Sequence, residues 1–145
     1  MTTQRFTSDT QVIRIGEGLV SRTLPKPEWT HAAHFAAAVY LVTTRPHGAP
    51  EREMPDIIRA YNLATGGENT DQAGYHETIT QASLHVVRHV LAGLPTDAGL
   101  HALTNAVLDA GYAQKDWLLA HWRRETLFSV TARRSWVAPD LAPLP

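Results

Sequence analysis

The chain has 145 residues, of which 43% are hydrophobic, and this length fits one domain, residues 1–145, with a single core. Its 13 basic and 14 acidic side chains give a formal net charge of -1, and no segment carries the row of basic residues typical of a nucleic-acid-binding protein. Cysteine is absent, which excludes disulfides, a thiolate nucleophile and zinc sites built from cysteine.

Residues 1–24 are the segment whose structure is hardest to predict from the sequence. Residues 1–8 lack the apolar run of a signal peptide, and no later stretch approaches the roughly 20 apolar residues of a membrane span. We therefore expect a cytoplasmic protein with no membrane partner. Residues 9–23 carry a helical stripe of Val12, Ile15 and Leu19, although their glycines also fit a strand and a turn; we favour the helix.

Three longer helices follow along the chain. The first is predicted from Pro27 to about Thr44, and a proline and a glycine end it. The second covers residues 50–64, with Pro55 either delaying its start or kinking it. After a polar loop, the third runs from about Tyr75 to Leu91 and stops at a glycine and a proline.

The last third of the chain also favours helices, but shorter ones. Thr96 and Asp97 predict the cap of a helix that reaches about Asp109, and further helices are expected over residues 115–122 and 129–137. Residues 138–145 form a proline-rich tail. The predicted fold is therefore all-α, a single compact domain of five to seven helices followed by this tail.

Three histidines stand out because helical spacing points them toward the core. At about 100° per residue, His31 and His34 fall on the apolar stripe of the first long helix. His76 falls on the apolar stripe of the third, whereas His85 and His89 fall on the opposite side. Imidazole titrates near neutrality and ligates metals as the neutral base, so a convergent group of histidines is a plausible site.

The spacing of these histidines suits a divalent metal such as zinc or iron. His31 and His34 are neighbours on one helix face and could share an ion, with His76 as a third ligand from a facing helix. Without a metal, His76 and Glu77 could act as a general acid or base. The alternative is that all three are ordinary core histidines, each bonded to a backbone acceptor.

Other polar and aromatic residues flank the histidines in the sequence. Trp29, Tyr61, Asn62, Tyr75 and Thr80 could line a pocket for a small-molecule ligand, although an aromatic residue or an asparagine at a helix end more often packs or caps. The sequence contains no phosphate loop and no dinucleotide fingerprint, so no nucleotide cofactor is expected.

Several of these segments resemble those of a group of small bacterial proteins. The similar segments are Trp29-Thr30-His31 with His34, Tyr61-Asn62, Gly74-Tyr75-His76-Glu77-Thr78 with Thr80, and Pro139-Asp140-Leu141 before Pro143-Leu144-Pro145. The resemblance extends from about Leu24 to the C-terminus. It implies a helical fold and a histidine site, and it supplies no reaction.

Two classes of function fit these observations. The first is a small enzyme in which His31, His34 and His76 bind a divalent metal that polarises a small-molecule substrate or activates water. The second is a non-catalytic helical module that binds a ligand or a partner and whose histidines are structural. Convergence of the three imidazoles would favour the first class, and separate imidazoles bonded to backbone carbonyls would favour the second.

Overall fold

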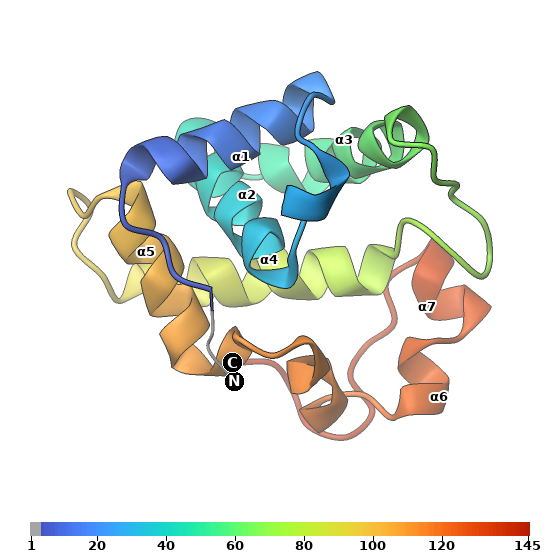
Figure 1. Ribbon diagram of the computed structural model, residues 1–145. Coiled ribbons are helices and arrows are strands. Elements are labelled where there is room, and N and C mark those ends of the chain that lie inside the picture. Colours follow the sequence, from blue (N-terminus) through green and yellow to red (C-terminus); the bar gives the residue numbers. More distant parts are fainter. Residues whose placement is uncertain (1–3) are drawn as a thin grey trace.

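A computed structural model describes residues 4–145 of the chain, and over this range it is all-helical, as predicted, with no strand (Figure 1). It has seven α-helices, two 3-10 turns (η1 and η3) and one π-helical turn (η2). Their bounds are α1 Asp9–Ser21, η1 Lys26–Glu28, α2 His31–Thr44, α3 Ala49–Ala64, α4 Glu77–Ala92, α5 Leu100–Val107, η2 Leu108–Tyr112, η3 Lys115–Ala120, α6 Arg124–Leu127 and α7 Val130–Arg134. None of these helices is long and apolar enough to cross a membrane.

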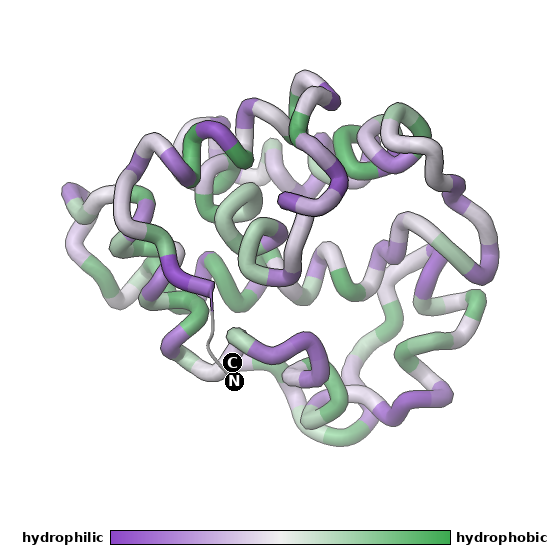
Figure 2. Tube along the Cα trace, viewed as in Figure 1, coloured by the Kyte–Doolittle hydropathy of each residue, from purple (hydrophilic) through white to green (hydrophobic). Residues whose placement is uncertain are grey.

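Helix α2 forms the centre of the molecule and packs against α1, α3, α4 and α5. Eight of its residues are buried, five of them alanines, and Figure 2 shows the hydrophobic colours running along it. A helix that is apolar on nearly all sides is typical of a core position. The small alanine side chains let its neighbours approach closely, so α2 is enclosed along its middle, whereas His34 near its start and Thr43 and Thr44 at its end are exposed.

Residues 9–21 form a helix, which settles the ambiguity between helix and strand in this segment. Val12, Ile15 and Leu19 are buried, as the helical stripe requires. Gly16 lies where α1 meets α2, because a Cβ atom there would stand 2.3 Å from the ring of Tyr40. The glycine that suggested a turn thus permits a close helix contact.

Pro55 lies inside α3 and is buried, and it does not delay the start of the helix, which begins at Ala49. Proline has no N–H, so the carbonyl of Glu51 lacks its usual helical partner. The side chain of Gln81 on α4 donates to that carbonyl at 3.0 Å. Arg88 on α4 also makes a bidentate ion pair with the Glu51 carboxylate. The backbone carbonyl and the side chain of Glu51 therefore both connect α3 to α4.

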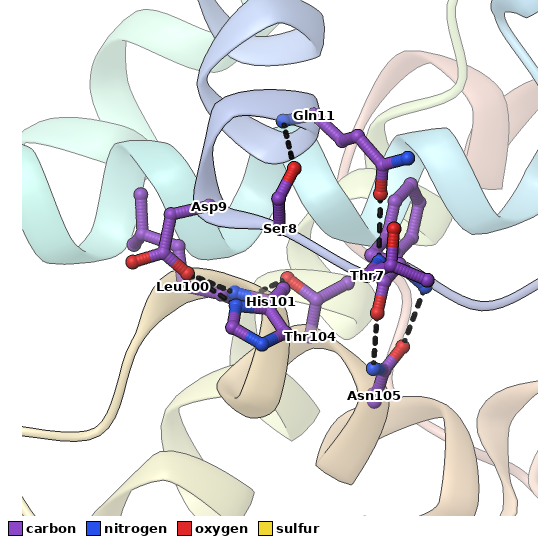
Figure 3. Close-up of polar contacts among 9 residues, drawn as sticks. Thr7, Ser8, Asp9, Gln11, Leu100, His101, Thr104 and Asn105 are labelled. Carbon is purple, nitrogen blue, oxygen red and sulfur yellow. Dashed lines mark hydrogen bonds and ion pairs between the residues drawn. The ribbon is translucent and has the colours of Figure 1, made fainter.

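Polar contacts fasten the segment before α1 to the distant helix α5 (Figure 3). The amide of Asn105 exchanges two hydrogen bonds with the backbone of Phe6, at 3.0 and 2.8 Å. Asp9 accepts from the backbone N–H and the ring Nδ1 of His101 in the first turn of α5, and these bonds lower the pKa of the Asp9 carboxyl. We call residues 6–9 together with 101–105 the N-terminal clasp.

The last third of the chain differs from the prediction in its element bounds. Helix α5 begins at Leu100 rather than after Asp97, α7 ends at Arg134 rather than Val137, and α6 was not predicted. The proline-rich tail, residues 138–145, returns to the body. The backbone N–H of Leu141 donates to His121, and Leu144 packs on the core.

Candidate functional site

A cavity opens at the N-terminal end of α2, between α4 and the C-terminal segments η3 and α6. Its volume is about 470 Å³, which suits a small-molecule ligand. The walls are mainly apolar and aromatic. The lining residues are Trp29, Thr30, His31, His34, Phe35, Ile79, Ser83, Lys115, Asp116, Trp117, Leu118, Leu119, Arg124, Leu127 and Phe128.

Trp29 forms one wall together with His34. The η1 turn presents Trp29 just before α2, where the hydroxyl of Thr30 caps the helix by accepting from the Ala33 N–H at 3.1 Å. The indole stacks on the His34 imidazole with ring centres 3.8 Å apart, and the edge of Tyr61 meets it from behind. The cap and the two ring contacts fix the position of both side chains.

His34 has a defined tautomer. Its Nδ1 lies 2.6 Å from the backbone carbonyl of Thr30, and because a carbonyl only accepts, Nδ1 carries the proton and Nε2 carries the lone pair. The surrounding protein removes water and lowers the pKa of His34, although the ring is open to solvent on its cavity side. No group within residues 4–145 hydrogen-bonds to Nε2, so a neutral His34 offers the cavity an acceptor.

His31 stands one turn earlier on the same side of α2 and has the opposite tautomer. Its Nε2–H donates at 2.8 Å to the carbonyl of Tyr112 in the π-helical turn η2. Burial lowers the pKa of His31, the bond to Tyr112 partly opposes this, and the charge of Lys115 lowers it further. His31 therefore joins α2 to η2 as a neutral ring.

His76 does not join the other two histidines. It is 7% exposed, lies outside the cavity lining and caps α4, where its Nδ1 accepts from the Ile79 N–H at 3.2 Å. Its Nε2–H donates to the carbonyl of Leu127 at 2.7 Å. Both ring nitrogens are occupied, so the helical-wheel prediction that His76 points inward holds, but its partners are backbone groups.

The predicted three-histidine metal site is not supported by this geometry. Across residues 4–145, no three histidine, aspartate or glutamate side chains gather closely enough to hold a metal ion. Each of His31, His34 and His76 instead hydrogen-bonds to a different backbone carbonyl. A zinc or iron site would need at least one further ligand moved into place beside His31 and His34.

The other predicted site residues lie away from the cavity, apart from Trp29. The Tyr61 hydroxyl donates to the carbonyl of Leu24, and the Thr80 hydroxyl donates to the carbonyl of His76. Glu77 accepts from the hydroxyl of Tyr75, whose pKa is raised mainly by burial. Glu77 is thus bonded to a phenol rather than placed against a substrate in the cavity.

Asn62 and Tyr75 serve a loop anchor that the sequence analysis missed. Asn69 accepts from the Asn62 side chain at 2.9 Å and from the Tyr75 N–H at 3.1 Å, and it donates to the carbonyl of Arg59. These bonds hold the loop before α4 against the end of α3. The two predicted pocket residues therefore have a structural role.

The sequence analysis also missed most of the cavity wall. Of the fifteen lining residues it assigned a role in the site to only three, Trp29, His31 and His34. The residues without an assigned role include Phe35, Ser83, Lys115, Trp117, Arg124 and Phe128. Trp117 is a partial exception, since the sequence shows a tryptophan in the short helix predicted over residues 115–122. Phe35 follows His34 on α2, whereas the residues of α4, η3 and α6 lie far from them in the sequence, and no spacing pattern connects these segments.

No family model, no curated protein and no solved structure matches this chain. The resemblance to small bacterial helical proteins therefore stays a prediction, and the site rests on the geometry of its own residues.

The three neutral histidines predict a stability that falls on acidification. The pKa of each of His31, His34 and His76 is lowered from 6.5, so the unfolded chain binds more protons than the folded chain below that pH. We expect the free energy of unfolding, measured by urea titration, to be level from about pH 8 to 7 and to fall from about pH 6.5 to 5.

The same titrations with His76→Asn test the cause. Asparagine can still cap α4 but does not titrate, so this variant should show a shallower fall. The shifted carboxyls, Asp9 and Glu51 among them, have lowered pKa values and contribute their losses only at more acidic pH. Stability that stays level or rises as the pH falls from 6.5 to 5 would contradict the assignment.

Proposed function

We propose that this protein binds a small organic molecule with a flat ring in the cavity at the end of α2, and that the ligand donates a hydrogen bond to Nε2 of His34. The observation that carries the proposal is an acceptor of fixed tautomer inside a cavity walled by Trp29, Phe35, Trp117 and Phe128. Aromatic walls favour a flat apolar ring, and the hydrogen bond to His34 would fix the orientation of the ligand.

Binding is better supported than catalysis. A general base works best when its pKa lies near the working pH, whereas the pKa of His34 is lowered and that of His31 is lowered too. Ser83 does not present a nucleophile, because its hydroxyl donates back to the Ile79 carbonyl at 2.7 Å. The divalent-metal enzyme that the sequence predicts would need ligands that the described residues do not bring together.

A phenol and its methyl ether test the proposal. Para-ethylphenol can donate its hydroxyl hydrogen to Nε2, whereas its methyl ether has nearly the same shape and cannot. We expect both to perturb the indole N–H signals of Trp29 and Trp117 in nitrogen-edited NMR spectra, with the phenol binding about fivefold more tightly, as one neutral hydrogen bond allows.

A pair of variants locates the hydrogen bond. His34→Leu removes the acceptor and should bring the affinity for the phenol down to that for the ether. His89→Leu removes an exposed histidine of α4 and should leave both affinities unchanged. If neither compound perturbs the two tryptophans, or if His34→Leu leaves the preference for the phenol intact, the proposal is wrong.

A further inference from the structure

The rim of the cavity carries more positive than negative charge. Lys115 and Arg124 line it together with one acidic residue, Asp116, while His31 and His34 are neutral. An empty cavity of this composition has a net charge of about one positive unit near neutral pH. A ligand with one negative charge would balance it.

Lys115 and Arg124 have no acidic partner in the described part of the chain. Within residues 4–145, no carboxylate forms an ion pair with Lys115 or Arg124, whereas Arg88 on the neighbouring face of α4 is fully paired with Glu51. The Arg124 guanidinium lies 5.7 Å from the centre of the Phe128 ring, which places it over an aromatic wall. Both cations therefore remain available to a ligand.

The charge of Lys115 also reaches the two imidazoles. It contributes to the lowered pKa of His31 and of His34, although burial is the larger cause in both. Lys115 and the proposed hydrogen-bond acceptor, His34, both line the cavity. A ligand held against His34 would have a cation within electrostatic range.

From the unpaired cations beside aromatic walls, we infer that the ligand is an aromatic monocarboxylate. Its ring lies among the aromatic side chains, its hydrogen-bond donor meets His34 Nε2, and its carboxylate faces Lys115 and Arg124. Arginine and lysine both bind carboxylates, arginine through two parallel hydrogen bonds. This inference rests on the proposed function and adds the charge of the ligand to it.

Asp116, the one acidic residue of the lining, affects which charge the cavity prefers in a ligand. A single acidic residue beside two cations disfavours a dianion and would attract an ammonium group if the ligand carried one. A zwitterion is therefore the natural competitor, and the experiment includes one. A monoanion fits the lining better than a zwitterion, because the two cations outnumber the single acid.

Four compounds that share a para-substituted phenol separate ring binding from charge. Phloretate carries a carboxylate, para-ethylphenol is neutral, tyramine carries an ammonium and tyrosine carries both charges. We expect phloretate to bind about tenfold more tightly than para-ethylphenol by isothermal titration calorimetry at low salt, and tyramine to bind most weakly. Raising the salt to about 0.5 M should reduce the advantage of phloretate, because the rim charges are exposed to solvent.

Charge-removing variants identify the residues. The double variant Lys115→Gln/Arg124→Gln should weaken phloretate about tenfold and change para-ethylphenol by less than about twofold. Arg123→Gln is the matched control, because this neighbouring exposed arginine lies outside the lining, and it should change neither affinity.

The outcomes distinguish the inference from the proposed function. If para-ethylphenol binds and phloretate binds no more tightly, the charge inference is wrong and ring binding stands. If tyrosine or tyramine binds more tightly than phloretate, Asp116 dominates the selection and the monocarboxylate is again wrong. If none of the four compounds binds, the proposed function itself fails.

Discussion

We expect His76→Ala to lower the free energy of unfolding by about 3 kcal/mol. The substitution removes the acceptor that caps the Ile79 N–H and the donor that satisfies the Leu127 carbonyl. The losses combine, because the side chain is almost completely buried and water cannot replace either bond fully. Urea denaturation at pH 7.5 measures the change.

Two further variants separate the capping bond from the rest. His85→Ala, on the exposed side of the same helix, should cost less than about 1 kcal/mol. His76→Asn should recover about 1 kcal/mol relative to His76→Ala, since asparagine is a good N-cap residue. Equal losses in His76→Ala and His85→Ala would show that the bonds of His76 contribute nothing to stability.

We expect Gly74→Ala to cost about 3 kcal/mol or more in the free energy of unfolding. The φ angle of Gly74 is 88°, which an L-residue adopts only with strain. An added Cβ atom would also stand 1.9 Å from the carbonyl oxygen of Glu68 and 2.9 Å from Cα of Asn69. Because these are backbone atoms, the loop that Asn69 anchors would have to move.

Gly66→Ala is the matched control for this prediction. Its φ angle is 86°, nearly that of Gly74, but nothing lies within 4 Å of the added Cβ atom. The strain should therefore appear alone, at about 1 kcal/mol. Thermal or urea denaturation measures the loss of unfolding free energy in each variant, and the difference between the two losses is the cost of the crowding at Gly74. Similar losses in both variants would mean that the close contact with Glu68 is relieved without cost.

The sequence predicted the fold class well because amphipathic spacing decides it. The predicted ends of α3 and α4 lie within two residues of the observed ends, because proline and glycine stop a helix at their own position in the chain. The 3-10 and π-helical segments and the short helix α6 were not predictable in this way, because they are too short to show a period. They pack against neighbouring short segments, η2 against α5 and η3, and α6 against α7.

The candidate site was predictable only in part, for a reason visible in α2. A helical wheel assigns a direction when one face is apolar, but α2 is apolar on nearly all sides, so its wheel could not separate the His34 position from the core. Trp29, His31 and His34 do share the cavity wall. His76 does not, because its distance from them depends on how α2 and α4 cross.

The N-terminal clasp has a consequence for the order of events during synthesis. Phe6 and Asn105 are 99 positions apart, and Asp9 and His101 are 92 apart. At bacterial or eukaryotic elongation rates of 5–20 residues per second, about 5–20 s pass between the synthesis of the two halves. Helix α1 can pair early with α2, but its other flank waits for α5, so ribosome-bound chains that end before α5 should expose apolar surface to chaperones and proteases.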